Sequence, residues 1–155
     1  MTPGVKAAQR HGVAHTLHAY RHDNASTSYG LEAAEALQLP PERVFKTLVV
    51  SLDGSQLAVA LVPVCDQLHM KSLARALGAR KAAMADAESA QRATGYVLGG
   101  VSPLGQKKRL PMVIDRSAQA FDTIFVSAGR RGLEIELSPQ DLASVTGAGF
   151  EALRR

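Results

Sequence analysis

Apolar residues recur along the chain at two spacings, one typical of strands and the other typical of helices. Residues 44–52 form a nearly continuous apolar run, which predicts a buried strand. Asp53-Gly54 and the apolar residues 57–62 follow, and this order predicts a hairpin of two antiparallel strands. Further strands are expected at 15–20, 80–84, 112–114, 123–126 and 133–137, with a turn at 129–132 joining the last two.

Helical spacing and capping residues predict the helices between these strands. Thr2-Pro3 and Ser138-Pro139 each place a capping residue before a proline at the first helical position. Asp86 is expected to cap another helix, and Ser28 is placed to cap one that Pro40-Pro41 would end. The expected helices span 3–11, 29–39, about 68–77, 86–92 and about 138–147, and the polar segment 21–28 is expected to be a loop.

Strands and helices interleave without the regular spacing of βαβ units, so we expect a mixed α/β fold. The 155 residues fit one domain, 1–155, with a mixed, largely antiparallel sheet and helices around it. The N-terminal residues lack an apolar export segment and no stretch reaches transmembrane length, so we expect a cytoplasmic protein without membrane contact. Cys65 is the single cysteine, which excludes an internal disulfide framework and agrees with a reducing compartment.

The segment 95–111 combines glycines, prolines and positive charge. Gly99 and Gly100 allow a ligand to approach main-chain N–H groups, and residues 107–109 read Lys-Lys-Arg. Together with a formal net charge of +4, this composition favours an anionic ligand. The alternative is a tight connection between two strands with a solvated basic edge. The segment matches neither a P-loop nor a dinucleotide-binding fingerprint.

Lys46 interrupts the apolar strand 44–52. Burial of an ammonium group is costly, so Lys46 must face water, a partner or a ligand. The alternative is an exposed strand end at which the aliphatic part of Lys46 covers Phe45. Cys65 has no basic neighbour in the sequence, so a small buried thiol is favoured over a nucleophile.

The other candidates for chemistry have simpler interpretations. The five histidines lack the carboxylate pattern of a metal site, so neither a metal nor a cofactor is expected. Glu134 and Glu136 alternate with apolar residues on a predicted strand, which a solvated face explains. The Gly-x-Ser-x-Gly motif is absent from the sequence, so no serine nucleophile of that type is indicated.

Segments 45–50, 94–109 and 125–133 together resemble the bacterial YbaK proteins, the free-standing deacylases of Cys-tRNA(Pro) and Cys-tRNA(Cys). The likeness runs from Thr2-Pro3 to the final helix. It implies a mixed sheet curled toward a barrel and flanked by helices, as in the editing domain of bacterial prolyl-tRNA synthetases. It also implies removal of cysteine mistakenly attached to proline tRNA, in trans and beside prolyl-tRNA synthetase.

The resemblance implies roles for residues at matching positions. The catalytic positions are Lys46, Gly99 and Gly100. The substrate pocket is expected to contain Tyr20, Tyr29, Thr47, Val101, Ser102, Pro103 and Ser127. The expected tRNA-binding residues, in two loops that the resemblance brings to the same side, are Lys107, Lys108, Arg109, Arg130 and Arg131. Relatives often have phenylalanine at position 29, and Ser127-Ala128-Gly129 stands where Ser-Gly-Gly is usual.

The resemblance further implies a mechanism without a protein nucleophile, in which the substrate thiol attacks its own ester carbonyl and releases a thiolactone. Two alternatives stay open. A deacylase of the same fold would remove another small amino acid, such as alanine, from tRNA(Pro), which a thiol-dependent mechanism cannot do. A non-catalytic adaptor would bind tRNA or the synthetase through the two basic loops.

Overall fold

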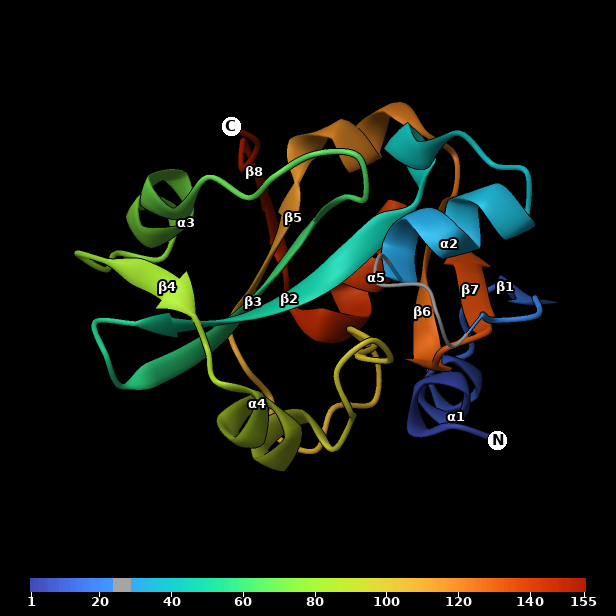
Figure 1. Cartoon of the computed structure of the whole chain (residues 1–155), viewed down its shortest axis with the longest axis horizontal. Coiled ribbons are helices and arrows are strands. Elements are labelled where there is room, and N and C mark those ends of the chain that lie inside the picture. The colour runs from blue at the N-terminus through green and yellow to red at the C-terminus, as the bar shows by residue number, and fades with distance from the viewer. Residues whose placement is uncertain (24–28) are drawn as a thin grey trace.

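The structure is a computed structural model that describes residues 1–23 and 29–155. Over these residues the chain forms two sheets with helices packed around them (Figure 1). The helices are α1 (Pro3–Arg10), α2 (Tyr29–Ala36), α3 (Met70–Ala76), α4 (Ala87–Thr94) and α5 (Pro139–Thr146), with short 3₁₀ helices η1 (Pro41–Arg43) and η2 (Arg116–Ala120). The strands are β1 (His15–Ala19), β2 (Phe45–Leu52), β3 (Gln56–Pro63), β4 (Ala82–Met84), β5 (Met112–Asp115), β6 (Ile124–Arg130), β7 (Leu133–Leu137) and β8 (Gly149–Glu151).

The five-stranded sheet is organised around the hairpin of β2 and β3. These strands pair antiparallel along their whole length, from Phe45 opposite Pro63 to Leu52 opposite Gln56. Asp53 and Gly54 both have positive φ at the turn, which suits the twist of the flanking strands. β4 pairs with the other edge of β2, while β5 and β8 extend the sheet beyond β3 in parallel. The expected hairpin is therefore confirmed.

The core lies on both faces of this sheet, which explains why β3 is apolar from Leu57 onward. Val59 and Leu61 pack into a cluster that also contains residues of α1, α5 and the smaller sheet. Ala58 and Val62 face the other way and pack with Leu73 of α3. Because successive strand residues point to opposite faces, an apolar residue is needed at each buried position of β3.

The smaller sheet, in the order β1-β7-β6, is antiparallel throughout. It meets the larger sheet at one isolated parallel bridge, between Val44 and Phe125. The 3₁₀ helix η1 ends directly before Val44, so the pairing with β6 does not extend toward the N-terminus. On the same edge of β2, pairing with β4 runs from Val50 to Leu52. The largely antiparallel pairing is confirmed. A single sheet curled toward a barrel was expected, whereas the described residues form two sheets that do not close into a barrel.

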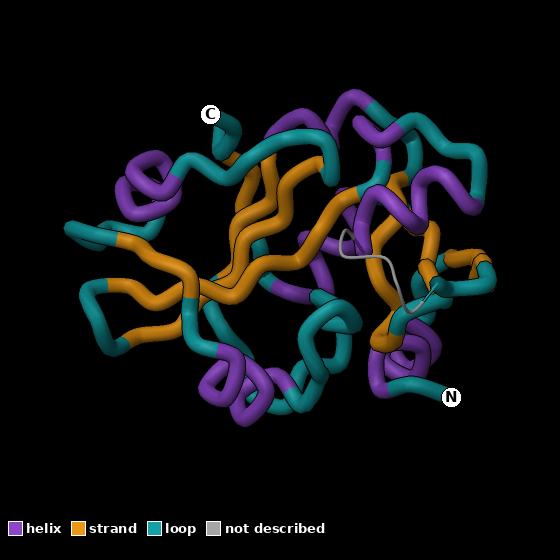
Figure 2. Tube along the Cα trace, in the orientation of Figure 1, coloured by secondary structure: helices purple, strands orange, loops and turns teal. Residues whose placement is uncertain are grey.

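Three of the capping residues predicted from the sequence are confirmed. The side chains of Thr2, Asp86 and Ser138 accept hydrogen bonds from backbone N–H groups in the first turns of α1, α4 and α5. Gly147 ends α5 in a left-handed conformation, with φ of 76°. The loop that leads from α4 to β5 carries the glycine-rich segment (Figure 2).

The end of α2 differs from the prediction. The helix stops at Ala36 instead of continuing to Leu39, because Gln38 has a left-handed conformation with φ of 56° and Leu39 donates its N–H to the carbonyl of Ala34. Ser28, the expected cap of this helix, lies outside the described residues, as does the expected loop from residue 24 onward. The sequence did not predict β8, η1 or η2.

Candidate active-site cleft

A cleft of about 320 Å³ lies beside the stretch of β2 that has a strand partner on one edge only. Between the bridge at Val44 and the pairing that begins at Val50, the described residues of β6 and β4 form no paired ladder with this edge. α2, the glycine-rich segment and the β6–β7 hairpin supply the other walls. The lining residues are Tyr20, Tyr29, Gly30, Leu31, Val44, Phe45, Lys46, Thr47, Leu48, Val64, Leu98, Gly99, Val101, Ser127, Arg130 and Glu134.

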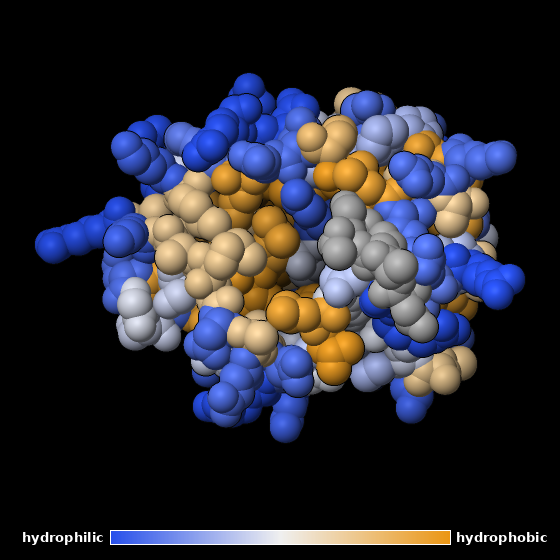
Figure 3. Space-filling view, in the orientation of Figure 1, coloured by the Kyte–Doolittle hydropathy of each residue, from blue (hydrophilic) through white to orange (hydrophobic). Residues whose placement is uncertain are grey.

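Apolar side chains surround the mouth of this cleft. Tyr29, Leu31, Val97 and Leu98 are large apolar residues that stay exposed, and Leu98 is 56% exposed. Figure 3 shows apolar residues gathered on the hollowed face of the molecule. Exposed apolar residues that cluster at one place mark a binding surface more often than residues scattered singly.

Lys46 lies on the open edge of β2 and lines the cleft. Phe45, its neighbour, is buried in the core on the opposite face of the strand. Burial lowers the pKa of the Lys46 ammonium group, and the negative charge of Asp66 offsets part of this effect. The described residues form no ion pair with Lys46. The cleft therefore contains a half-buried ammonium group that can interact with a ligand.

Gly99 and Val101 are the parts of the glycine-rich segment that face the cleft. Gly99 has φ of +86°, and a Cβ at this position would lie 2.7 Å from Cδ2 of Tyr29, so a larger residue does not fit. Neither the Gly99 nor the Val101 N–H group donates a hydrogen bond to any described residue. Both are donors that a ligand oxygen can use.

Three residues assigned to the site from the sequence do not line the cleft. Gly100 is buried, and its N–H group already donates to the carbonyl of Val97 at 3.0 Å. Ser102 is fully buried, and its hydroxyl accepts a hydrogen bond from the Leu104 N–H group at 3.1 Å. Pro103 lines a different cavity. These three residues of the glycine-rich segment therefore lie behind the cleft wall, and they support it without lining the cleft.

Three polar side chains from three elements complete the cleft. Tyr20, directly after β1, is half-buried, and burial raises the pKa of its hydroxyl group. Ser127 on β6 accepts a hydrogen bond from the Gly129 N–H group at 3.1 Å. Thr47 on β2 has a buried hydroxyl with no hydrogen-bond partner among the described residues. Because an unpaired buried hydroxyl is costly, Thr47 is a further group that a ligand can satisfy.

Glu134 is a cleft residue that the sequence interpretation missed. It was expected on a solvated face together with Glu136, but it is 6% exposed and its carboxyl group forms no hydrogen bond or ion pair with the described residues. Burial raises the pKa of Glu134 to about 8. Glu136 is instead paired with His18 and Arg43. The available signal was the hairpin register, which places Glu134 opposite Ser127.

Comparison with known proteins gives this cleft a family context. Residues 22–145 match the model of the aminoacyl-tRNA editing domain, and this range contains every cleft-lining residue except Tyr20. The chain belongs to this family. The resemblance drawn from the sequence is confirmed at this level.

Individual relatives of this editing domain agree with the family match. A protein of Enterococcus faecalis named "Putative Cys-tRNA(Pro)/Cys-tRNA(Cys) deacylase EbsC" is 35% identical over 151 residues, which cover 96% of this chain and 90% of that protein. A proline--tRNA ligase of Moorella thermoacetica is 33% identical over 104 residues, but these cover only 18% of the ligase. A solved structure described as "a putative trans-editing enzyme for prolyl tRNA synthetase" has a TM-score of 0.82 at 23% identity, over 100% of this chain and 99% of that one. The last match shows a shared fold.

The basic residues expected to bind tRNA do not form one cluster in this editing domain. Lys107 and Lys108 line a broad groove of about 850 Å³ beside α4 and β4. Arg109 lies next to a smaller cavity, and Arg130 lines the cleft. The guanidinium group of Arg131 packs over Tyr29 instead. These positive charges are therefore divided among separate surfaces.

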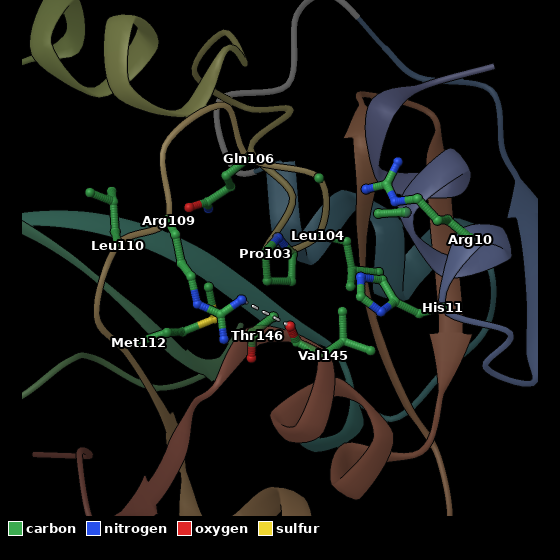
Figure 4. A pocket seen from close by; sticks show the side chains of 12 residues that line it. Arg10, His11, Pro103, Leu104, Gln106, Arg109, Leu110, Met112, Val145 and Thr146 are labelled. Atoms are coloured by element: carbon green, nitrogen blue, oxygen red, sulfur yellow. Dashed lines mark hydrogen bonds between the residues drawn. The ribbon is translucent and has the colours of Figure 1, made fainter.

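The smaller cavity, of about 150 Å³, lies on the other side of the glycine-rich segment (Figure 4). Arg10 and His11 stand at the C-terminal end of α1, and Arg109 donates to the carbonyl of Val145 near the C-terminal end of α5. Cations at these places compensate the negative ends of the helix dipoles. Their positions are thus explained by the fold.

Cys65 lies outside the cleft and is exposed, so the expected buried thiol is wrong. It follows the end of β3, where the chain turns at the surface. Partial burial and the negative charge of Asp66 raise the pKa of the thiol, which disfavours the thiolate. In the part of the chain that the structure describes, no three His, Cys, Asp or Glu side chains are grouped to hold a metal ion, and no helix is long and apolar enough to cross a membrane.

Glu134 should make the stability of the editing domain depend on pH. Its carboxyl group keeps its proton up to a pKa of about 8 when folded, but loses it near the ordinary glutamate pKa of 4.5 when unfolded. The contribution of Glu134 to the free energy of unfolding is therefore fully present below its pKa in the unfolded state. It is lost as the pH rises through its pKa in the folded state. Within this window each pH unit lowers the free energy of unfolding by up to about 1.4 kcal/mol.

Glu134→Gln removes this titration, so the free energy of unfolding of the variant should fall less between about pH 5 and pH 9 than that of the wild type. Urea denaturation at both pH values measures the difference. Glu88→Gln, at an exposed position on α4, is the matched control and should behave as the wild type. Equal pH dependence in the wild type and Glu134→Gln would contradict the assignment.

Proposed function

We propose that this protein is an aminoacyl-tRNA deacylase that removes cysteine from mischarged tRNA(Pro), acting in trans beside prolyl-tRNA synthetase. The observation that carries the proposal is the half-buried Lys46 in a cleft whose lining contains neither histidine nor cysteine. Family membership and the name of the Enterococcus faecalis relative support the same reaction class. Lys107 and Lys108 in the broad groove and the net positive charge of the chain support tRNA as the substrate.

The chemistry of the cleft supports a nucleophile that comes from the substrate. Ser127 has no histidine in the cleft to act as its base, so it is a poor nucleophile. A cysteinyl ester brings its own thiol close to its own carbonyl carbon, which gives an intramolecular reaction a large advantage. The sulfur forms a bond to the carbonyl carbon, the ester C–O bond breaks, and the thiol proton ends on the ribose oxygen. The products are a thiolactone and free tRNA.

Several polar groups of the cleft have distinct roles in this reaction. Lys46 polarises the ester carbonyl and stabilises the oxyanion, together with the N–H groups of Gly99 and Val101. Binding of the amino acid places its α-ammonium group beside Glu134, and this positive charge favours loss of the carboxyl proton, so that the two groups pair. Thr47 and Ser127 hydrogen-bond the substrate and hold it in the geometry for attack.

Lys46→Ala should lower kcat/KM for Cys-tRNA(Pro) by about a hundredfold or more, because it removes a charged group that acts on the oxyanion. The melting temperature should change little, since Lys46 faces the cleft and not the core. Single-turnover deacylation and thermal unfolding measure the two effects. Lys71→Ala on α3, whose side chain is exposed, is the control. A variant at position 46 that keeps wild-type turnover would remove Lys46 from the reaction.

The substrate thiol, and not Cys65, should be required. Cys65→Ala should deacylate Cys-tRNA(Pro) at a rate near that of the wild type, because Cys65 lies outside the cleft. The wild-type enzyme should act much more slowly on the same tRNA charged with serine, whose hydroxyl group is far less acidic than a thiol. Alanine on tRNA(Pro) should be stable. Equal rates on the serine and cysteine esters, or rapid removal of alanine, would favour attack by water.

Lys107 and Lys108 should contribute to tRNA affinity by neutralising phosphate groups. Replacing either with alanine should reduce the log–log dependence of affinity on salt by about 0.7 to 0.9 for each phosphate that is no longer neutralised. Fluorescence anisotropy with charged tRNA over a range of salt concentrations measures this slope. Lys6→Ala, at an exposed position of α1 outside the groove, should leave the slope unchanged. If the position 107 and 108 variants also keep the wild-type slope, these lysines serve solubility.

A further inference from the structure

Three groups of the described residues hold the Arg131 side chain within the molecule. Its Cζ atom lies 4.0 Å from the centroid of the Tyr29 ring, a stacking distance. Its Nη2 atom lies 3.6 Å from Oε1 of Glu32 and donates to the carbonyl of Asp23 at 3.1 Å. Glu32 also accepts from the Asp23 N–H group at 2.8 Å. The side chains of Arg131 and Glu32 are only 19% and 9% exposed.

Tyr29 connects this cluster to the glycine-rich segment. It is the first residue of α2, it lines the cleft, and its ring packs so closely on Gly99 that a Cβ there would lie 2.7 Å from Cε2. The ring therefore spans from α2 to the opposite wall at the mouth of the cleft. Arg131 is the residue that stacks on this ring, and the buried Glu32 fixes the guanidinium group in place.

Arg130 provides a direct contrast, although it is the adjacent residue. It is exposed, it lines the cleft and it forms no ion pair with the described residues. It is free to meet a phosphate group. Arg131 would have to leave its stack on Tyr29 and its buried ion pair to do the same, and both losses oppose the move.

We infer that Arg131 is a positioning residue: it holds the Tyr29 ring against Gly99 and so sets the width of the cleft mouth. The inference rests on the proposed deacylase function and specifies how the same cleft selects its substrate. A ring held in place admits a small aminoacyl side chain and hinders a bulky one. This role differs from the tRNA-binding role that the sequence resemblance implied for Arg131.

The test compares Arg131→Ala with Arg130→Ala on two substrates, Cys-tRNA(Pro) and the cysteinyl ester of adenosine, which has no phosphate groups. Arg131→Ala should lower kcat by about tenfold on both, because it acts through Tyr29, and should leave the salt dependence of tRNA binding unchanged. Arg130→Ala should raise KM for the tRNA alone. The methionyl ester of adenosine, whose thioether cannot attack the carbonyl, should inhibit Arg131→Ala more strongly than it inhibits the wild type.

A double-mutant cycle shows whether Arg131 acts through Tyr29. Tyr29→Ala should resemble Arg131→Ala, the double variant should be no worse than either, and Tyr29→Phe, which keeps the ring, should be close to the wild type. Effects that multiply in the double variant, or a loss confined to the tRNA substrate with a reduced salt slope, would show that Arg131 contacts tRNA and would overturn the inference.

A second measurement does not depend on activity. Fluorotyrosine replaces the three tyrosines, and Tyr29→Phe identifies the Tyr29 signal in the fluorine NMR spectrum. Arg131→Ala and Glu32→Gln should shift this signal, whereas Arg130→Ala should not. An unmoved signal in Arg131→Ala would overturn the inference. A wild-type enzyme that deacylates neither substrate would refute the proposed function, while the NMR result would still decide whether Arg131 positions Tyr29.

Discussion

The half-free edge of β2 determines where the cleft forms. One edge of the strand is fully paired with β3, but on the other edge the described residues pair in register with β2 at Val44 and then from Val50 onward. Between these points, β3 fixes the backbone of β2 along one edge, and the other edge has no strand of the described residues paired with it. Side chains such as Lys46 therefore have a rigid base and an open space beside them. The interruption that prevents the two sheets from closing into a barrel also creates the cleft.

The interior of this cleft disfavours charge of either sign. Burial lowers the pKa of Lys46 and raises the pKa of Glu134, and no described residue pairs with either group. A site in this state gains from a ligand that carries complementary groups, because the ligand replaces the water that burial has removed. An aminoacyl ester has both an ammonium group and a carbonyl oxygen. The electrostatics of the cleft therefore match the substrate that the family membership indicates.

Local signals in the sequence predicted what depends on local interactions. The caps Thr2 and Ser138 and the hairpin after Asp53-Gly54 form as expected, since each depends on a few neighbouring residues. The split into two sheets, the burial of Glu134 and the stack of Arg131 on Tyr29 were not predicted. Each depends on segments distant in the chain, and the alternation at Glu134 is the same whether its face meets water or a cleft. The resemblance located the cleft, but it could not separate wall residues from those behind the wall, such as Ser102.

The proposed reaction would depend on positioning and polarisation by the cleft, so its rate would depend on the shape of the cleft walls. The glycines of the 95–111 segment serve this shape through packing. A Cβ on Gly100 would lie 3.0 Å from Cα of Arg130, and one on Gly105 would lie 2.3 Å from the carbonyl oxygen of Pro3. The segment is thus pressed against the β6–β7 hairpin and the start of α1, and this packing, more than flexibility, explains why glycine occupies these positions.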